Sequence, residues 1–300
     1  MIRSLFTAIG GLKSHQTMMD VTANNIANVN TVGYKTDRAT FASMLSQTVR
    51  GASAPQAGGL GGTDPTQVGL GVALQGIQSL LTQGSLQTTG QWNDLAIQGD
   101  GYFVVSQSRP TGGAPTDTEF TRAGNFTVDV NGDLVSQAGQ YVLGSSLASA
   151  GPPPTFNADL GPINIPVNAE AVAVGSDGVV SYTDSAGAQQ VAGQVAIAKF
   201  PNPGGLSRLS DNMYGVSPNS GVFDPTNQNN GATPTAGTAT WGAPGTNGRG
   251  GISSGTLEMS NVDLAQEFTS MITAERGFQA NARTITTSDS MLEELVNLKR

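Results

Sequence analysis

The stretch ANNIANVNTVGYK, residues 23–35, contains three asparagines close together and a glycine soon after them. Asn24, Asn25 and Asn28 carry amides that compete with the backbone for hydrogen bonds, so they are poor residues for a helix interior. Gly33 permits the turn that commonly follows a helix. The stretch therefore predicts the end of an N-terminal helix whose side-chain amides need hydrogen-bond partners.

Upstream of this stretch, apolar side chains recur at alternating steps of three and four residues. This period is typical of a narrow coiled-coil seam rather than of the broader apolar face of a globular surface helix. The large apolar members of this seam are Leu5, Ile9, Leu12, Met19 and Ile26. Gln16 and two adjacent glycines, Gly10 and Gly11, interrupt it. We therefore expect this helix to be marginal on its own.

The C-terminus repeats the pattern. Ser260 or Asn261 is expected to cap the helix, with Asp263 placed to favour its positive end. The large apolar members of the second seam are Leu264, Phe268, Met271, Phe278, Ile285, Leu292 and Val296. We predict that the two seams pack subunits of an assembly against one another, and we call these twelve residues the seam residues. A helical hairpin packed on the body of its own chain is the alternative.

The region between the two ends has the pattern of short antiparallel strands. Two apolar runs flank a Gly-Asp-Gly turn within residues 95–105, and four further turns are expected at Asn131-Gly132, Ala138-Gly139, Asp177-Gly178 and Ala186-Gly187. Residues 48–66 and 218–251 are rich in glycine with alanine, asparagine or proline, and we expect flexible linkers there. The predicted fold class is α+β, with paired N- and C-terminal coiled-coil-like helices and a β-rich middle domain.

The expected domain boundaries follow from these patterns. Residues 1–30 and 258–300 are predicted to form a terminal helical domain, residues 31–75 a linker region, and residues 76–257 a β-rich outer domain. Three prolines at 152–154 mark a boundary inside the last of these.

Composition excludes several classes of function. Charged residues make up 12% of the 300-residue chain and the net charge is −8, which is unfavourable for binding phosphate backbones. The chain has no cysteine and one histidine, so thiolate chemistry is excluded and a metal site is not indicated. Residues 129–133, DVNGD, have their glycine at the wrong position for a calcium loop. We predict no catalytic residues, no cofactor, no metal, no nucleic acid and no small-molecule substrate.

The stretch quoted first resembles the N-terminal signature of the flagellar rod and hook proteins, the axial family of the bacterial flagellum. The residues that carry this signature are Asn24, Asn25, Asn28, Gly33, Tyr34 and Lys35. Further segments are similar in order along the chain: VGLGV (68–72), LTQGSLQTTGQWNDLAIQGDGYFVV (81–105), FTRAGNFTVDVNGDLV (120–135) and FPNPGGLSRLSDNMYGVSPNSG (200–221). The C-terminal SNVDLAQEF, RGFQAN and NLKR resemble hook proteins in particular.

The resemblance implies an architecture and a set of partners. Paired terminal helices would form an inner tube, and the β-rich middle would form an outer domain. The chain would be exported through the flagellar export apparatus without a cleaved signal peptide. It would polymerise with copies of itself and contact other axial proteins of the rod, the hook cap and the hook–filament junction. Amides at the end of the first helix would suit a surface packed against neighbouring subunits.

Within this family the resemblance favours a subunit of the hook, a flexible tube that transmits torque from rod to filament. Many hook proteins carry an extra outer β-domain after the strand matching YVLG (141–144), whereas here only residues 145–170 intervene. In this respect the chain also resembles the distal rod protein, which is the alternative. A secreted β-rich adhesin or carbohydrate-active protein is an alternative from a different class.

Overall fold

The chain divides into two compact units. The computed structural model describes residues 2–55, 61–110, 115, 117–149, 155–228 and 238–298. Unit 1 comprises residues 1–27, 36–80 and 262–300, and unit 2 comprises residues 28–35 and 81–261. The boundaries differ from the predicted ones mainly because residues 28–35 belong to the β-rich unit, while most of the predicted linker region belongs to the helical unit.

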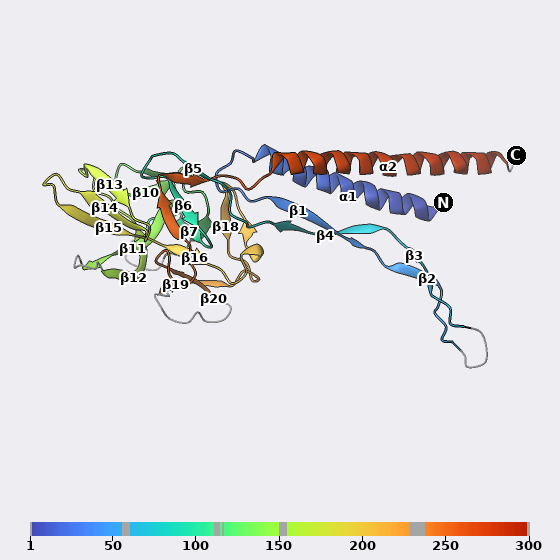
Figure 1. Ribbon diagram of the computed structural model, residues 1–300, viewed down its shortest axis with the longest axis horizontal. Coiled ribbons are helices and arrows are strands. Elements are labelled where there is room, and N and C mark those ends of the chain that lie inside the picture. Colours follow the sequence, from blue (N-terminus) through green and yellow to red (C-terminus); the bar gives the residue numbers. More distant parts are fainter. Residues whose placement is uncertain are drawn as a thin grey trace. The chain divides into compact units, whose positions relative to one another are not determined.

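Unit 1 contains two long helices, α1 (Ile2–Ala27) and α2 (Leu264–Asn297), which pack side by side (Figure 1). Asp263 caps α2, because its carboxylate accepts hydrogen bonds from the backbone N–H groups of Ala265 and Gln266. The prediction of Ser260 or Asn261 as the cap is therefore wrong. The amide of Asn261 donates instead to Thr82, and a carboxylate is a good cap because it also complements the helix dipole.

The two helices run antiparallel in one continuous register. Ser4 lies opposite Ser288, with their hydroxyl oxygens 3.5 Å apart. Further along, Gly11 faces Asn281 and His15 faces Gly277. A Cβ atom on Gly11 would lie 2.7 Å from Nδ2 of Asn281, and one on Gly277 would lie 2.5 Å from Nε2 of His15. The glycines that weaken each helix alone therefore make room for a side chain of the other.

The rest of unit 1 is a two-stranded ribbon (Figure 1). Strand β1 (Asp37–Ser43) pairs antiparallel with β4 (Val72–Ser79), and β2 (Ser46–Arg50) pairs antiparallel with β3 (Thr66–Gly69). Strands therefore occupy both ends of the predicted flexible segment 48–66, of which residues 56–60 lie outside the described residues. Backbone pairing, supported by valine and threonine, outweighs the glycine content at these ends.

Unit 2 is built around a 14-stranded sheet with the order β13-β14-β15-β11-β7-β16-β20-β19 and six further strands attached off this path. The first strands of unit 2 are β5 (Leu86–Thr88), β6 (Leu95–Gln98), β7 (Tyr102–Ser106), β8 (Thr118–Thr121), β9 (Phe126–Val128), β10 (Leu134–Ser136), β11 (Tyr141–Ser149) and β12 (Thr155–Pro162). The next are β13 (Ala171–Val174), β14 (Val179–Thr183), β15 (Gln189–Val195) and β16 (Ile197–Lys199). The last are β17 (Ser207–Arg208), β18 (Met213–Gly215), β19 (Val222–Gln228), β20 (Thr238–Gly242), β21 (Gly251–Ser254) and β22 (Thr256–Glu258).

The four predicted turns of unit 2 are confirmed. They connect β9 to β10, β10 to β11, β13 to β14 and β14 to β15, and each connected pair is antiparallel. The glycine at the second position of each predicted turn pair has φ between 76° and 84°, a region that glycine adopts at little cost. The strands beside the Gly-Asp-Gly turn behave differently, because β6 pairs with β21 while β7 pairs with β8, β11 and β16.

The segment 218–251, predicted as a flexible loop, contains strands β19 and β20. Trp241 on β20 is fully buried, and Phe223 on β19 packs against the same core. These aromatic side chains outweigh the glycine, asparagine and proline content around them. Residues 229–237 of the segment, and the prolines at 152–154, lie outside the described residues.

Strand β7 separates two hydrophobic cores. Phe103 and Val105 enter one core, and Tyr102 and Val104 enter the other, as expected for a strand buried on both faces. The loop after β8 approaches the neighbouring strand β6 closely, because a Cβ atom on Gly124 would overlap the carbonyl oxygen of Leu95. The cores of unit 2 therefore depend on tight backbone contacts as well as on side chains.

We predict that Gly124→Ala lowers the free energy of unfolding of unit 2 by roughly 2–3 kcal/mol, because the overlapping atom is backbone and cannot move aside cheaply. Urea unfolding of the full chain measures this. Gly161→Ala is the matched control, since no atom lies within 4 Å of the position that its Cβ would take. It should change stability by less than about 0.5 kcal/mol, and equal effects of the two variants would contradict the packing argument.

Candidate assembly site

The seam residues are not the ones that the two helices bury against each other. The residues of α1 that are buried are Ala8, Gly11, Ser14, Thr22 and Asn25, and their spacing places them on one face. Ala274 is the buried residue of α2. None of the twelve seam residues is buried: Ile9, Leu264, Phe268 and Val296 are exposed, and the other eight are half-buried. The closest helix contact therefore uses small residues and leaves the seams partly open.

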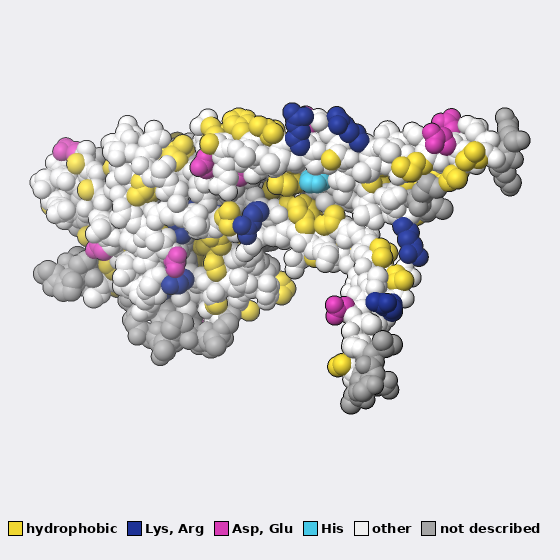
Figure 2. Space-filling view, turned by 45° about the vertical axis from the view of Figure 1, so that its right-hand side comes forward, with side chains coloured by type: hydrophobic (Ala, Val, Ile, Leu, Met, Phe, Trp, Pro, Cys, Tyr) yellow, Lys and Arg dark blue, Asp and Glu magenta, His cyan; other side chains and the backbone are white. Residues whose placement is uncertain are grey.

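Unit 1 also exposes large apolar side chains outside the seams. Phe6 on α1 is 70% exposed, and Leu45 in the ribbon is 85% exposed. Figure 2 shows hydrophobic side chains, in yellow, at the surface of the helices and of the ribbon. In the described part of unit 1, the buried hydrophobic residues are Ala8 and Ala274 alone. Unit 1 therefore has no large apolar core of its own, and its exposed apolar surface is typical of an interaction site.

Asn25 is bound within unit 1. Its Nδ2 donates to the carbonyl oxygen of Asp37 at 2.8 Å, and its Oδ1 accepts from the Asp37 N–H at 3.0 Å. The side-chain amide thus joins the end of α1 to the start of β1 as a strand partner would. It also hydrogen-bonds to Glu267, whose pKa is nevertheless raised by burial. The predicted role of the signature amides at a subunit surface therefore does not apply to Asn25.

The other two signature asparagines are less buried. Asn28 is half-buried, and its Oδ1 accepts a hydrogen bond from the Thr31 hydroxyl at 3.1 Å. Asn24 is exposed on α1. Of the three amides, only that of Asn25 is buried at the junction of helix and strand.

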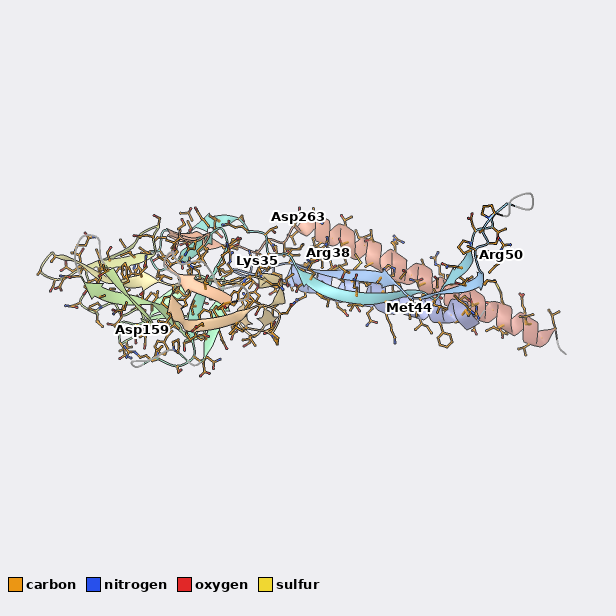
Figure 3. The ribbon with its side chains drawn as sticks, turned by 90° about the horizontal axis from the view of Figure 1, so that it is seen from below. Lys35, Arg38, Met44, Arg50, Asp159 and Asp263 are labelled. Atoms are coloured by element: carbon orange, nitrogen blue, oxygen red, sulfur yellow. The ribbon has the colours of Figure 1, made fainter. Side chains whose placement is uncertain are left out.

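Gly33, Tyr34 and Lys35 are buried in unit 2. Gly33 has φ of 71°, and its N–H donates to the carbonyl oxygen of Glu258 at 2.8 Å. The Arg208 guanidinium lies over the Tyr34 ring at 5.2 Å from the centroid. Lys35, labelled in Figure 3, is 1% exposed, and its Nζ donates to Glu258 Oε1 at 2.6 Å and to the Thr82 carbonyl at 2.8 Å.

Glu258 is the centre of a buried charge cluster with Lys35 and Arg122. Its side chain is 0% exposed, and Oε2 accepts from Nη1 of Arg122 at 3.0 Å. Oε1 accepts from Lys35 and, at 2.9 Å, from the Gly84 N–H. Arg122 donates in addition to the Gly99 carbonyl at 2.7 Å. We call Lys35, Arg122 and Glu258 the charge cluster; it holds two cations and one anion.

Burial and pairing act against each other in the charge cluster. Burial alone would raise the pKa of Glu258, but Arg122, Lys35 and the Gly84 N–H together outweigh it and hold that pKa below its usual value. For Lys35, burial is the largest effect and lowers its pKa, against the hydrogen bond and charge of Glu258. The charged form of Glu258 is therefore strongly stabilised by its surroundings. The charged form of Lys35 is instead disfavoured by its burial.

A recess of about 600 Å³ lies beside Thr31 and Val32 and is lined mainly by uncharged residues, with Asp211 its one ionisable side chain. Within the described ranges, no three metal-ligating side chains come together, and no described helix is long and apolar enough to cross a membrane. The features that stand out are the open apolar surface of unit 1 and the charge cluster of unit 2.

Comparison with protein families matches three parts of the chain. Residues 5–35 match the model described as "Flagella basal body rod protein". Residues 96–182 match "Flagellar hook protein FlgE/F/G D1 domain", and residues 253–298 match "Flagellar basal body rod FlgEFG protein C-terminal". The first and last of these matches contain all twelve seam residues, and they contain Lys35 and Glu258.

Three relatives align with the whole chain. The flagellar basal-body rod protein FlgG of Bacillus subtilis (strain 168) is 46% identical over 300 residues, covering 100% of both chains. FlgG of Borreliella burgdorferi is 33% identical over 302 residues, and the flagellar hook protein FlgE of the same organism is 29% identical over 465 residues. Both of these alignments also cover 100% of each chain.

We predict that Glu258→Gln lowers the free energy of unfolding of unit 2 by about 3–5 kcal/mol, because it leaves two buried cations without a counter-charge. Lys35→Met should lower the same free energy of unfolding by less, about 1–2 kcal/mol, since Arg122 and Glu258 remain as a pair of opposite charges. Urea unfolding of the full chain measures both.

The control for this prediction is Lys199→Met, which breaks an ion pair with Asp100 in which the two side chains are 36% and 78% exposed. It should cost less than about 1 kcal/mol. A loss for Lys35→Met as large as that for Glu258→Gln would contradict the charge argument.

Proposed function

The chain belongs to the family of flagellar rod and hook proteins, the axial proteins of the bacterial flagellum, and we propose that within it the chain is a subunit of the distal rod. As a member of this family it is a structural component of the flagellum. Family membership also argues against the adhesin and the carbohydrate-active protein considered from the sequence. The hook, which the C-terminal motifs favoured, is the second candidate.

Alignment length is the observation that carries the rod proposal. The rod protein of Borreliella burgdorferi aligns over 302 residues, close to the length of this chain. The hook protein of the same organism needs 465 aligned positions, so it contains a long stretch that this chain lacks. The comparison within one organism separates the two kinds of subunit by length, and this chain has the length of the rod protein.

The ribbon of unit 1 supports the same choice. A hook bends, so its subunits must slide against one another, and a flexible linker over residues 48–66 would permit this. Instead β1–β4 and β2–β3 are paired strands, whose hydrogen bonds resist extension and bending. Paired strands at this position suit a straight, stiff tube better than a flexible one.

Assembly follows from the open apolar surface of unit 1. Axial proteins polymerise, and the seam residues would be buried when copies of this chain pack side by side. Full burial of each large apolar side chain contributes about 1.5–3 kcal/mol, and the separate chain gains this only in part, because the seam residues are exposed or half-buried. The partners are then copies of itself, adjoining axial proteins of the rod and hook, and the export apparatus.

A deletion distinguishes the two candidates. Basal bodies isolated from cells that lack this protein, and viewed by electron microscopy, should show a shortened rod and no hook if the chain forms the distal rod. A complete rod without a hook would assign the chain to the hook instead. Complementation with the intact gene should restore the missing part.

We predict that Phe268→Asp abolishes polymerisation of the purified protein, because Phe268 is a 50% exposed seam residue and a charge there cannot be buried between subunits. The unfolding transition of unit 2 should be unchanged, since the substitution lies outside it. Thr269→Asp, at the next and likewise exposed position of α2, is the control and should still polymerise. Polymer formation is measured by sedimentation, and normal polymers from Phe268→Asp would count against the seam.

A further inference from the structure

Three segments of unit 2 carry the chain to and from unit 1, and all three meet at Glu258. They are residues 28–35, 81–86 and 256–261, which we call the neck segments. The chain passes between the units after residues 27, 35, 80 and 261, so each passage is at the end of a neck segment. Every force or motion transmitted along the chain must enter unit 2 through one of them.

Hydrogen bonds join each of the three neck segments to both of the others. The first and third are joined by the Gly33 N–H to the Glu258 carbonyl and by Lys35 to the Glu258 carboxylate. The first and second are joined by Lys35 to the Thr82 carbonyl. The second and third are joined by the Gly84 N–H to the Glu258 carboxylate and by pairing of β5 with β22. Glu258 takes part in two of the three combinations.

Arg122 fastens this set to the central strand of unit 2. It donates to the Glu258 carboxylate, and its guanidinium lies over the ring of Tyr102 at 5.4 Å from the centroid. Tyr102 is the first residue of β7, the strand that separates the two cores. Residues 35 and 258 are thus tied to each other and to β7, although 223 positions separate them in the chain.

We propose that the charge cluster is a mechanical clamp that carries load directly between the first and third neck segments. A pull applied through the two ends of the chain is then borne at Lys35 and Glu258 and does not reach the sheets of unit 2. The Lys35–Glu258 ion pair should resist a pulling force, because its rupture would leave buried charges unpaired. Unpaired charges are costly in a low-dielectric interior. Its importance in a torque-bearing polymer rests on the proposed function, but the clamp itself belongs to the single chain.

The proposal is tested by comparing the effect of a variant when force is applied along two different directions. The chain has no cysteine, so two introduced cysteines define where the force is applied. The pair Asn30→Cys and Ala265→Cys, both exposed, pulls through the neck, whereas the exposed pair Val130→Cys and Ser185→Cys pulls across unit 2. Lifetimes of the full chain at constant force are measured in an optical trap, because forced unfolding is governed by the unfolding rate.

With force through the neck, Glu258→Gln should shorten the lifetime at least about tenfold, whereas across unit 2 it should change it by less than about twofold. Arg109→Met, which breaks an ion pair with the buried Asp133 outside the neck segments, should leave the neck lifetime within about twofold. Equal shortening in both directions would mean that Glu258 provides general stability only, and no shortening through the neck would mean that it bears no load. Either result overturns the proposal.

Lys35→Met provides the second variant, for the case that Glu258→Gln does not fold. It keeps the Arg122–Glu258 pair and removes only the direct link between residues 35 and 258, so the same dependence on direction is expected, with shortening of at least about fivefold through the neck. Because all measurements use the isolated chain, failure of the clamp is distinguishable from failure of the rod assignment, which the deletion experiment decides.

Discussion

A buried carboxylate between two buried cations is the interaction on which the rest of unit 2 depends. Glu258, Lys35 and Arg122 come from the two ends and the middle of the chain, and each is at least nine-tenths buried. Charges at such positions are tolerated only when their partners are in place. The sheets of unit 2 are therefore not sufficient for its folding. Unit 2 also needs the neck segment 28–35, which precedes β1, and the neck segment 256–261, which precedes α2.

The two units solve the problem of burial in opposite ways. Unit 2 buries large apolar side chains on both faces of β7 and pairs the buried charges of Lys35, Arg122 and Glu258 with one another. Unit 1 buries small residues where its helices meet and leaves large apolar side chains such as Phe6 and Phe268 open. The first arrangement is that of a domain stable by itself, and the second is that of a domain completed by neighbours. The division suits a subunit whose one part assembles while the other keeps its shape.

Local features of the fold were predictable from the sequence, and the distant contacts were not. Both helices and four hairpin turns follow from short-range patterns, namely the helical period and glycines with positive φ. The cap at Asp263 and the strands β19 and β20 were missed, because hydrogen bonding and aromatic burial outweighed the local propensity. The charge cluster was hidden because Lys35 pairs with one of 22 acidic residues across 223 positions, and no local pattern contains that contact. A weak signal did exist, since charged residues make up only 12% of the chain, and a charge inside a β-like segment needs a partner.

The same scarcity of charge explains how one chain can combine both kinds of unit. Helices that pair through charged or bulky residues would occupy the surface needed for assembly. Here Gly11 and Gly277 make room for the side chains of Asn281 and His15 on the other helix, so the neighbouring apolar stripes stay partly exposed. A helix contact made of small residues is weak alone, and it becomes adequate when neighbours enclose it. The weak contact between α1 and α2 and the exposure of the seam residues thus have one cause, the small residues at the helix contact. Both favour a chain whose helices become ordered where it assembles.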